Sequence, residues 1–303
     1  MSINRIIVLV SVLIFISGCQ CRICENTQIK KHCWQKLLTD ELENDSPWVQ
    51  IHSAEYLLDL NLELETVREH FLKHDQKYSG QEFLRNGHNR ILVRLNSDKE
   101  RRLREIHARA FLDEVPDKFS ATETLGKLYY KGSKEDLIYL KKLRSNSEAD
   151  ELMRYMSSWI IDDNDGEREA FLVSSLSEHT ANKLTPTIGV WGLYYIKKLQ
   201  NPETFSALQK ALLNSNLPPE ARMLAGELLL KYGKISFQKV ADVKQSLDKL
   251  PENDRSWLYR QAWCQVLLYT DDAEFALTEL NKYLKSDNPE LRIVAAWILL
   301  KRY

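Results

Sequence analysis

Four cysteines near the start of the chain, Cys19, Cys21, Cys24 and Cys33, are the residue types best suited to chemistry. Cys21 and Cys24 are separated by two residues, the spacing of a metal-binding or redox-active pair. Structural zinc sites take four ligands, and His32 beside Cys33 would complete the set. However, two adjacent residues do not have the usual spacing of a second zinc-ligand pair. A disulfide or free thiols are therefore the preferred interpretation.

Other polar residues also fall at spacings that could bind a metal ion. His70 and His74 lie four positions apart, so on a helix both imidazoles could reach one ion. No third ligand is identifiable, and two solvated histidines are the preferred interpretation. The acidic segment DDNDGE, Asp162 to Glu167, lacks the bidentate Glu that ends a calcium-binding loop, so we expect a turn there. The sequence predicts no cofactor and no bound metal.

Catalytic motifs are absent from the sequence. It contains no G-x-S-x-G nucleophile motif and no Gly-rich phosphate loop, and its histidines form no constellation with a nucleophile. We therefore expect that the protein is not an enzyme.

Aromatic residues offer a second way to bind a ligand. Exposed rings in a groove could stack on sugars or anchor a peptide, whereas buried rings would pack the core. The sequence leaves both roles open for six residues on or beside predicted helices: Trp159, Trp191, Tyr194, Tyr195, Trp257 and Trp263.

An apolar segment, Ile6 to Ile16, precedes the cysteines. It is too short to cross a bilayer, which takes about 20 apolar residues. With Arg5 before it and two small residues after it, the segment has the parts of a secretory signal peptide. The sequence Ile16-Ser17-Gly18-Cys19 resembles the lipobox of bacterial lipoproteins, in which an aliphatic residue and two small residues precede a cysteine.

The lipobox resemblance implies how the mature protein is held. It implies cleavage before Cys19, a diacylglycerol on the thiol and a further acyl chain on the new amine. Several acyl chains anchor a protein stably, because each buried methylene contributes about 0.8 kcal/mol. Gln20 stands where an aspartate would resemble an inner-membrane retention signal, so we expect attachment to the outer membrane. The alternative is an ordinary secreted protein cut after Gly18.

The charge balance limits the partners that we expect. Removal of residues 1–18 takes away one charged residue, Arg5, so 41 basic residues face 43 acidic ones. This near-balance gives no general attraction to nucleic acid or to anionic lipid. We expect no nucleic-acid partner, and contact with the membrane through the lipid anchor.

The composition favours an all-α protein. Only 10 Gly and 8 Pro occur in 303 residues, which leaves little room for hairpins or flexible linkers. A capping residue directly before a proline is typical of a helix start. This pattern predicts four helix starts, at Ser46-Pro47, Thr185-Pro186, Asn201-Pro202 and Asn288-Pro289.

Several predicted helices share one pattern, a small residue followed by an aliphatic pair about one turn later. Extending its register gives Leu57, Ile91, Leu125, Ile160, Leu193, Leu229, Leu267 and Leu299, in steps of 32 to 38 residues. A period in this range indicates a solenoid of helix pairs. The second helix of each pair is predicted at residues 64–78, 98–112, 134–143, 167–177, 202–213, 237–250 and 273–284.

Three segments carry a family resemblance: NDSPWVQIHSAEYLL, NLPPEARMLAGELLL and SDNPELRIVAAWILL. They resemble first helices of HEAT-type repeats, in which Asn/Asp-Pro precedes an Ala-rich stretch and a Leu pair. Tetratricopeptide repeats have a similar period, but their Trp, Leu-Gly and Tyr spacing is not reproduced. The resemblance implies an α-solenoid with interaction surfaces, and it implies no catalysis.

Together these patterns predict an all-α, right-handed α-solenoid of antiparallel, HEAT-like helix pairs, with about seven and a half repeats of roughly 34 residues. We expect a signal peptide at 1–18, a tether with a short helix at 19–44 and the repeat domain at 45–303. The last helix has no second-helix partner, so it either caps the stack or leaves an apolar face open.

The function expected from this architecture is a non-catalytic scaffold that is anchored by lipid at the bacterial cell envelope and binds another protein. One alternative is a groove that binds a glycan or a peptide. A second is an enzyme or accessory subunit that acts on an envelope polymer. This last alternative requires a pocket with two titratable groups within hydrogen-bonding reach.

Overall fold

The protein is all-helical in the computed structural model, which describes residues 27–76, 78, 81–111, 118–161, 165–177, 182–251 and 256–303. Its α-helices are α2 to α17, and three short 3₁₀-helices lie at Glu41–Glu43, Ser157–Trp159 and Leu267–Tyr269. The described residues contain no β-strand, and one isolated bridge joins Lys131 to Ile161. The predicted all-α class is confirmed.

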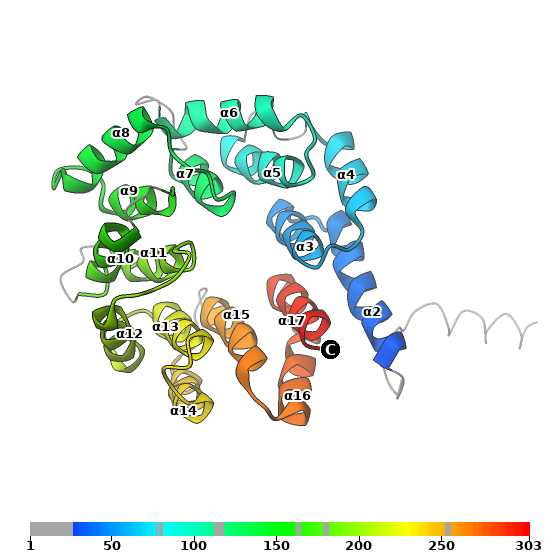
Figure 1. Ribbon diagram of the computed structural model, residues 1–303. Helices are drawn as coiled ribbons and strands as arrows, with labels where there is room; N and C mark the ends of the chain where they lie inside the picture. The colour runs from blue at the N-terminus through cyan, green and yellow to red at the C-terminus, as the bar shows by residue number, and fades with distance from the viewer. Residues whose placement is uncertain are drawn as a thin grey trace, which may run out of the picture.

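The helices form two concentric rows (Figure 1). Each inner helix contacts the next one around the ring, and α17 contacts α3. The inner helices are α3 (Pro47–Asp59), α5 (Glu82–Arg94), α7 (Lys118–Lys127), α9 (Glu151–Met156), α11 (Thr185–Leu193), α13 (Pro219–Lys231), α15 (Ser256–Val266) and α17 (Pro289–Arg302).

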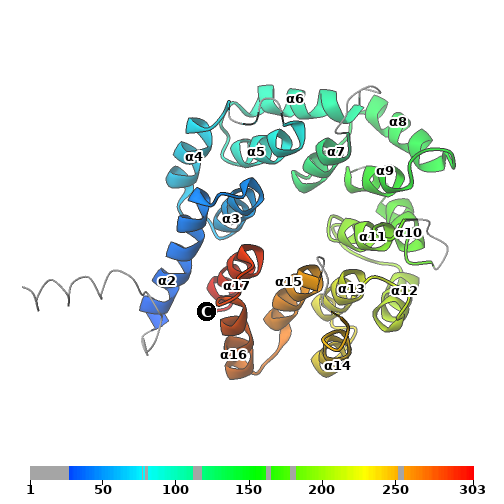
Figure 2. The same ribbon diagram turned by 180° about the vertical axis from the view of Figure 1, so that it is seen from behind.

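The outer helices cover the inner row from outside, and the same arrangement is seen from behind (Figure 2). The predicted positions of the second helices are confirmed to within a few residues at their ends. The outer helices are α2 (Thr27–Asp40), α4 (Leu64–Lys73), α6 (Lys99–Phe111), α8 (Lys134–Ser145), α10 (Asp165–Ser174), α12 (Pro202–Leu213), α14 (Phe237–Leu247) and α16 (Ala273–Tyr283).

The two ends of the helical chain meet and close the ring. The helix α17 packs on α2 and α3, and the indole of Trp297 stacks on Tyr56 with ring centroids 4.6 Å apart. Arg292 Nη2 donates to Glu41 Oε1 at 2.7 Å, and His52 Nδ1 lies 2.8 Å from Glu290 Oε2. We expected the last helix either to cap the stack or to leave an apolar face open. Neither arrangement occurs, because α2 and α3 cover α17.

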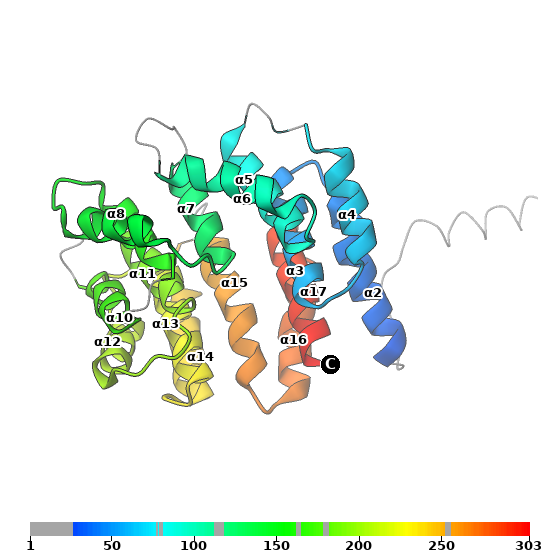
Figure 3. The same ribbon diagram turned by 45° about the horizontal axis from the view of Figure 1, so that its top comes forward.

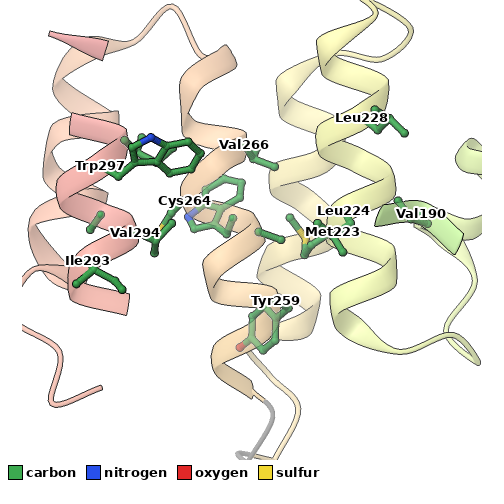
Figure 4. Close-up of a cluster of buried hydrophobic side chains, with 14 of the residues drawn as sticks. Val190, Met223, Leu224, Leu228, Tyr259, Cys264, Val266, Ile293, Val294 and Trp297 are labelled. Atoms are coloured by element: carbon green, nitrogen blue, oxygen red, sulfur yellow. The ribbon is translucent and has the colours of Figure 1, made fainter. Parts of the chain in front are cut away.

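The core lies between the two rows and along the contacts of the inner helices. All eight residues of the predicted register are at most 1% exposed. Figure 4 shows how side chains of α11, α13, α15 and α17 pack side by side, with Val190, Leu224, Cys264 and Val294 among them. The repeating apolar positions of the sequence therefore build the core, which divides into a larger cluster and a smaller one that contains Leu125 and Ile160.

Three of the four predicted helix starts are confirmed. The helices α3, α12 and α17 begin at the proline, and Asn201 Oδ1 caps α12 by accepting from the Glu203 amide at 2.9 Å. The fourth, α11, begins one residue earlier than predicted, at Thr185, with Leu184 as its N-cap. Thr185 is fully buried, so packing rather than capping fixes this end.

Candidate functional site

The cysteine group of the sequence analysis is only partly described. Cys19, Cys21 and Cys24 lie outside the described residues, while His32 is exposed and Cys33 half-buried on α2. Cys33 and Cys264 form no disulfide, and burial raises the pKa of the Cys264 thiol. Among the described residues, no three His, Cys, Asp or Glu side chains are placed to share a metal ion.

His70, in the last turn of α4, and His74, the residue that follows this helix, are held by local contacts. His70 Nδ1 lies 3.1 Å from Glu43 Oε1. His74 Nδ1 is 2.9 Å from the carbonyl oxygen of His70, which lies one turn earlier. The Nδ1 atom of each histidine therefore has a partner, in the 3₁₀-helix Glu41–Glu43 for His70 and in α4 for His74.

The six aromatic residues divide into core and surface positions. Trp159 and Trp263 are 1% and 2% exposed, so both pack the core. Trp191, Tyr194, Tyr195 and Trp257 are half-buried. Trp159 packs against two of the half-buried rings, since its ring centroid lies 6.5 Å from that of Trp191 and 5.0 Å from that of Tyr195.

Tyr129 extends this aromatic group to the surface. It follows α7, it is 62% exposed, and its ring lies edge-on to Tyr195 with centroids 5.8 Å apart. Its φ of 53° is in the left-handed region. A side chain with a Cβ pays about 1–2 kcal/mol to adopt this region. The backbone is therefore strained at an exposed aromatic residue.

The equivalent positions at the ends of other inner helices carry different residue types. Two residues after α3, α5 and α13, the positive φ belongs to Asn61, Asn96 and Gly233. Asn and Gly are the residues that adopt this helix-ending conformation most easily. The sequence analysis missed Tyr129, although a comparison of the repeats at this position would have singled it out.

An ion network lies beside these aromatic residues on α3, α5 and α7, and we call it the inner cluster: Glu55, Arg90, Glu123 and Lys127. The Arg90 guanidinium is hydrogen-bonded to Glu55, and its Nη1 also donates to Thr124 Oγ1 at 3.0 Å. Lys127 Nζ lies 2.8 Å from Glu123 Oε1. Each carboxylate therefore has a cationic partner.

The inner cluster stays ionised at neutral pH. Burial acts to raise the pKa of Glu55, but attraction to Arg90, Lys127 and His52 outweighs it and lowers the pKa to about 2. Burial also acts to raise the pKa of Glu123, but attraction to Lys127 and Arg90 outweighs it, so this pKa is lowered as well. Groups that titrate this far from pH 7 are poor general acids or bases.

A second buried ion cluster joins α5 and α6. Asp75 accepts from Arg102 at 2.9 and 3.0 Å and from Arg85 at 2.9 Å. Arg102 is 1% exposed, although it lies in the mixed-charge segment Lys99 to Glu105, a pattern that is typical of a solvated helix face. Burial lowers the pKa of His88 to about 4, because two guanidinium groups offset the attraction of Asp75.

Two cavities are lined by described residues. One, of about 610 Å³, lies between α2 and the ends of α3 and α17, and its lining includes Lys31, His32 and Leu300. The other, of about 460 Å³, is lined by Lys131, Gly132, Lys134, Leu137, Ile138 and Lys141. Neither lining contains a carboxylate.

No protein-family model, no curated protein and no solved structure matches the chain. None of the described helices is long and apolar enough to span a membrane.

Proposed function

We propose that this protein is a non-catalytic scaffold that is anchored by lipid at Cys19, in the outer membrane of a bacterial cell envelope, and that binds another protein. Its helix pairs would be HEAT-like repeats of a right-handed, antiparallel α-solenoid whose first and last repeats meet. The burial of all eight register residues supports this repeat assignment, because equivalent positions of stacked repeats share one core.

The pairing of charges supports a role without catalysis. In the inner cluster each carboxylate has a cationic partner, and the pKa values of Glu55 and Glu123 lie below the usual range. Neither cavity described above brings a carboxylate together with a second titratable group. A general acid–base site would need such a pair with pKa values near the working pH.

The strained, exposed Tyr129 is the observation that carries the binding proposal. Exposed aromatic residues are frequent anchors in protein interfaces. Backbone strain concentrates at functional sites, where the side chain has a use that offsets its cost. We therefore place the partner contact at the end of α7, where Tyr129 meets Tyr195 beside the inner cluster.

Crosslinking on native membranes, followed by purification of the full chain, tests this function. We expect the wild-type protein to recover one stoichiometric partner and Tyr129→Gly to recover at least about 10-fold less, since burial of an aromatic side chain contributes about 1.5–3 kcal/mol. Asn96→Gly makes the same backbone change after α5 and should recover the partner normally. Repeated absence of a stoichiometric partner from the wild-type protein would contradict the scaffold function.

The anchor is tested in the same cells. Wild-type protein should incorporate a labelled fatty acid and sediment with outer membranes, whereas Cys19→Ala should lose the label and enter the soluble fraction. A wild-type protein without label would instead identify an ordinary secreted protein.

A further inference from the structure

We propose that the cavity beside α8 binds an acidic, apolar segment of a partner protein, with two carboxylates on either side of an aliphatic side chain. We call this surface the α8 cleft; it consists of the six residues that line the 460 Å³ cavity, Lys131, Gly132, Lys134, Leu137, Ile138 and Lys141. The proposal rests on the proposed scaffold function and names a chemical class for its partner.

The α8 cleft has an apolar floor that is open to solvent. Ile138 is 63% exposed on the outer surface of α8, and Leu137 is half-buried beside it. Gly132 closes the other side, and a Cβ at this position would lie 2.9 Å from Leu137 Cδ2. A side chain at position 132 would therefore contact Leu137, one of the two apolar residues of the floor.

The rim of the cleft carries two exposed cationic side chains, Lys134 and Lys141. Lys134 and Lys141 are exposed and form no ion pair with a described residue. The nearest buried carboxylate, Asp136, is already committed: it accepts from the Ser133 amide, from the Tyr130 hydroxyl and from His107, each at 2.9 Å. An anionic ligand would thus supply the missing charge.

The spacing along α8 defines the ligand further. Lys134, Ile138 and Lys141 lie on one stripe of the helix, so the backbone positions of the two lysines are about 10 Å apart along its axis, with Ile138 between them. In a polyproline II segment, every third residue returns to the same side after about 9.3 Å. Two carboxylates three residues apart would match the two lysines.

The shape of the surface favours a peptide over other anions. A flat bilayer surface cannot fill a concavity, and the phosphates of a nucleic acid would leave Ile138 and Leu137 in contact with polar groups. A peptide segment that carries both carboxylates and aliphatic side chains has groups for the rim and for the floor.

Fluorescence anisotropy with the full chain in detergent tests the α8 cleft. The probe is a labelled peptide of repeated Glu-Leu-Pro triplets, and the matched control peptide has Gln-Leu-Pro triplets. We expect saturable binding of the first and at least about 10-fold weaker binding of the second. Lys134→Glu with Lys141→Glu should abolish binding of the Glu peptide and create binding of a Lys-Leu-Pro peptide.

A matched pair on another outer helix provides the control. Lys210 is exposed on α12 near Leu213, which is 69% exposed, so Lys210→Glu and Leu213→Ser change similar residues elsewhere. These two variants should bind the Glu peptide normally, while Ile138→Ser should bind it more weakly. All of these residues are exposed, so none of the variants should fail to fold.

Two outcomes would overturn the proposal. One is equal binding of the Glu and Gln peptides. The other is sedimentation with phosphatidylglycerol vesicles that depends on Lys134 and Lys141 while the peptide does not bind, which would make the surface a lipid contact. A crosslinked native partner that is unaffected by the α8 variants would leave the scaffold function intact and refute only this site.

Discussion

Glu227 is a carboxyl group placed where it is difficult to ionise. It lies buried on α13, its Oε1 accepts from the Tyr269 hydroxyl at 3.0 Å, and its Oε2 has no hydrogen-bond partner. Burial raises the pKa of Glu227 to about 7, although Tyr269, Lys231 and Lys301 act to lower it. The folded protein therefore holds a proton that the unfolded chain releases near its ordinary pKa of 4.5.

This proton makes stability depend on pH. Because the pKa is raised on folding, the protonated carboxyl stabilises the folded state fully below about pH 4.5, and this stabilisation is lost as the pH rises through 7. We expect the Glu227 contribution to fall by on the order of 3 kcal/mol across this interval. Urea unfolding at pH 5 and pH 8 should show a decrease for the wild-type protein that Glu227→Gln lacks. His88, whose pKa is lowered, changes in the opposite direction in both proteins and cancels in the comparison.

The burial of charged side chains is the feature that was predicted least well from the sequence. The neighbours of Arg102 carry mixed charges, which from sequence alone indicates a solvated helix face rather than a buried residue. Its partner Asp75 lies 27 residues earlier in the chain. A charge can be buried only where such a partner is supplied, and the helix pattern alone does not show which segment will supply it. Glu227 is a similar case, since its partner Tyr269 lies 42 residues away.

Several inner helices end with the same backbone hydrogen bond. After α3, α5, α7 and α13, an amide donates back to a carbonyl five residues earlier, for example from Tyr130 to Leu125 at 3.0 Å. This bond closes the helix and requires a left-handed residue just before the donor. Asn or Gly occupies that position in three of these helices, and Tyr129 occupies it in α7.

Tyr129→Gly should therefore stabilise the protein. We expect a gain of about 0.5–1 kcal/mol in the free energy of unfolding, because the cost of the left-handed backbone exceeds the entropy that glycine adds to the unfolded chain. Gly233→Ala is the reverse test, since nothing lies within 4 Å of its added Cβ and only the backbone cost remains. Urea denaturation of both variants measures the effect. A loss of stability in Tyr129→Gly would show that the tyrosine contributes more through packing than it costs through strain.

Helices themselves were well predicted from the sequence. The apolar register, the proline positions and the amphipathic second helices all depend on residues within a few turns, and the structure places a helix at each of them except Ile160, which directly follows the 3₁₀-helix Ser157–Trp159. Local patterns are reliable where the core repeats with the same period. The start of α11 differs because Thr185 is buried by its neighbours, a tertiary effect that the local pattern does not contain.

At the scale of the whole molecule, the closed ring is the feature that the sequence did not indicate. The contacts that close it join α17 to α2 and α3, and they bring together residues 238 and 251 positions apart. A pattern within single helices does not predict that the first and last helices of the chain will meet. Such a contact depends on the small rotation between each helix pair and the next. In Figure 3 the ends of α2 and α17 lie along the same edge of the ring.

Trp297→Ala should open the ring. Trp297 is buried against Tyr56, and truncation of a buried Trp costs about 3–5 kcal/mol. Hydrogen exchange should become faster in α2, α3 and α17 and remain unchanged in α9 and α11. Trp159→Ala, which removes a buried indole far from the closure, should give the opposite distribution. Uniformly faster exchange in Trp297→Ala would mean that the ring unfolds as one unit.

Closure also sets an order in time. During synthesis at about 5–20 residues per second, α2 and α3 would leave the ribosome on the order of 10–50 s before α17 is complete. Contacts between such distant segments form late, because the intervening chain must first be ordered. Until then the apolar side chains that α17 covers have no partner, and the nascent chain is exposed to aggregation at its first helices rather than its last.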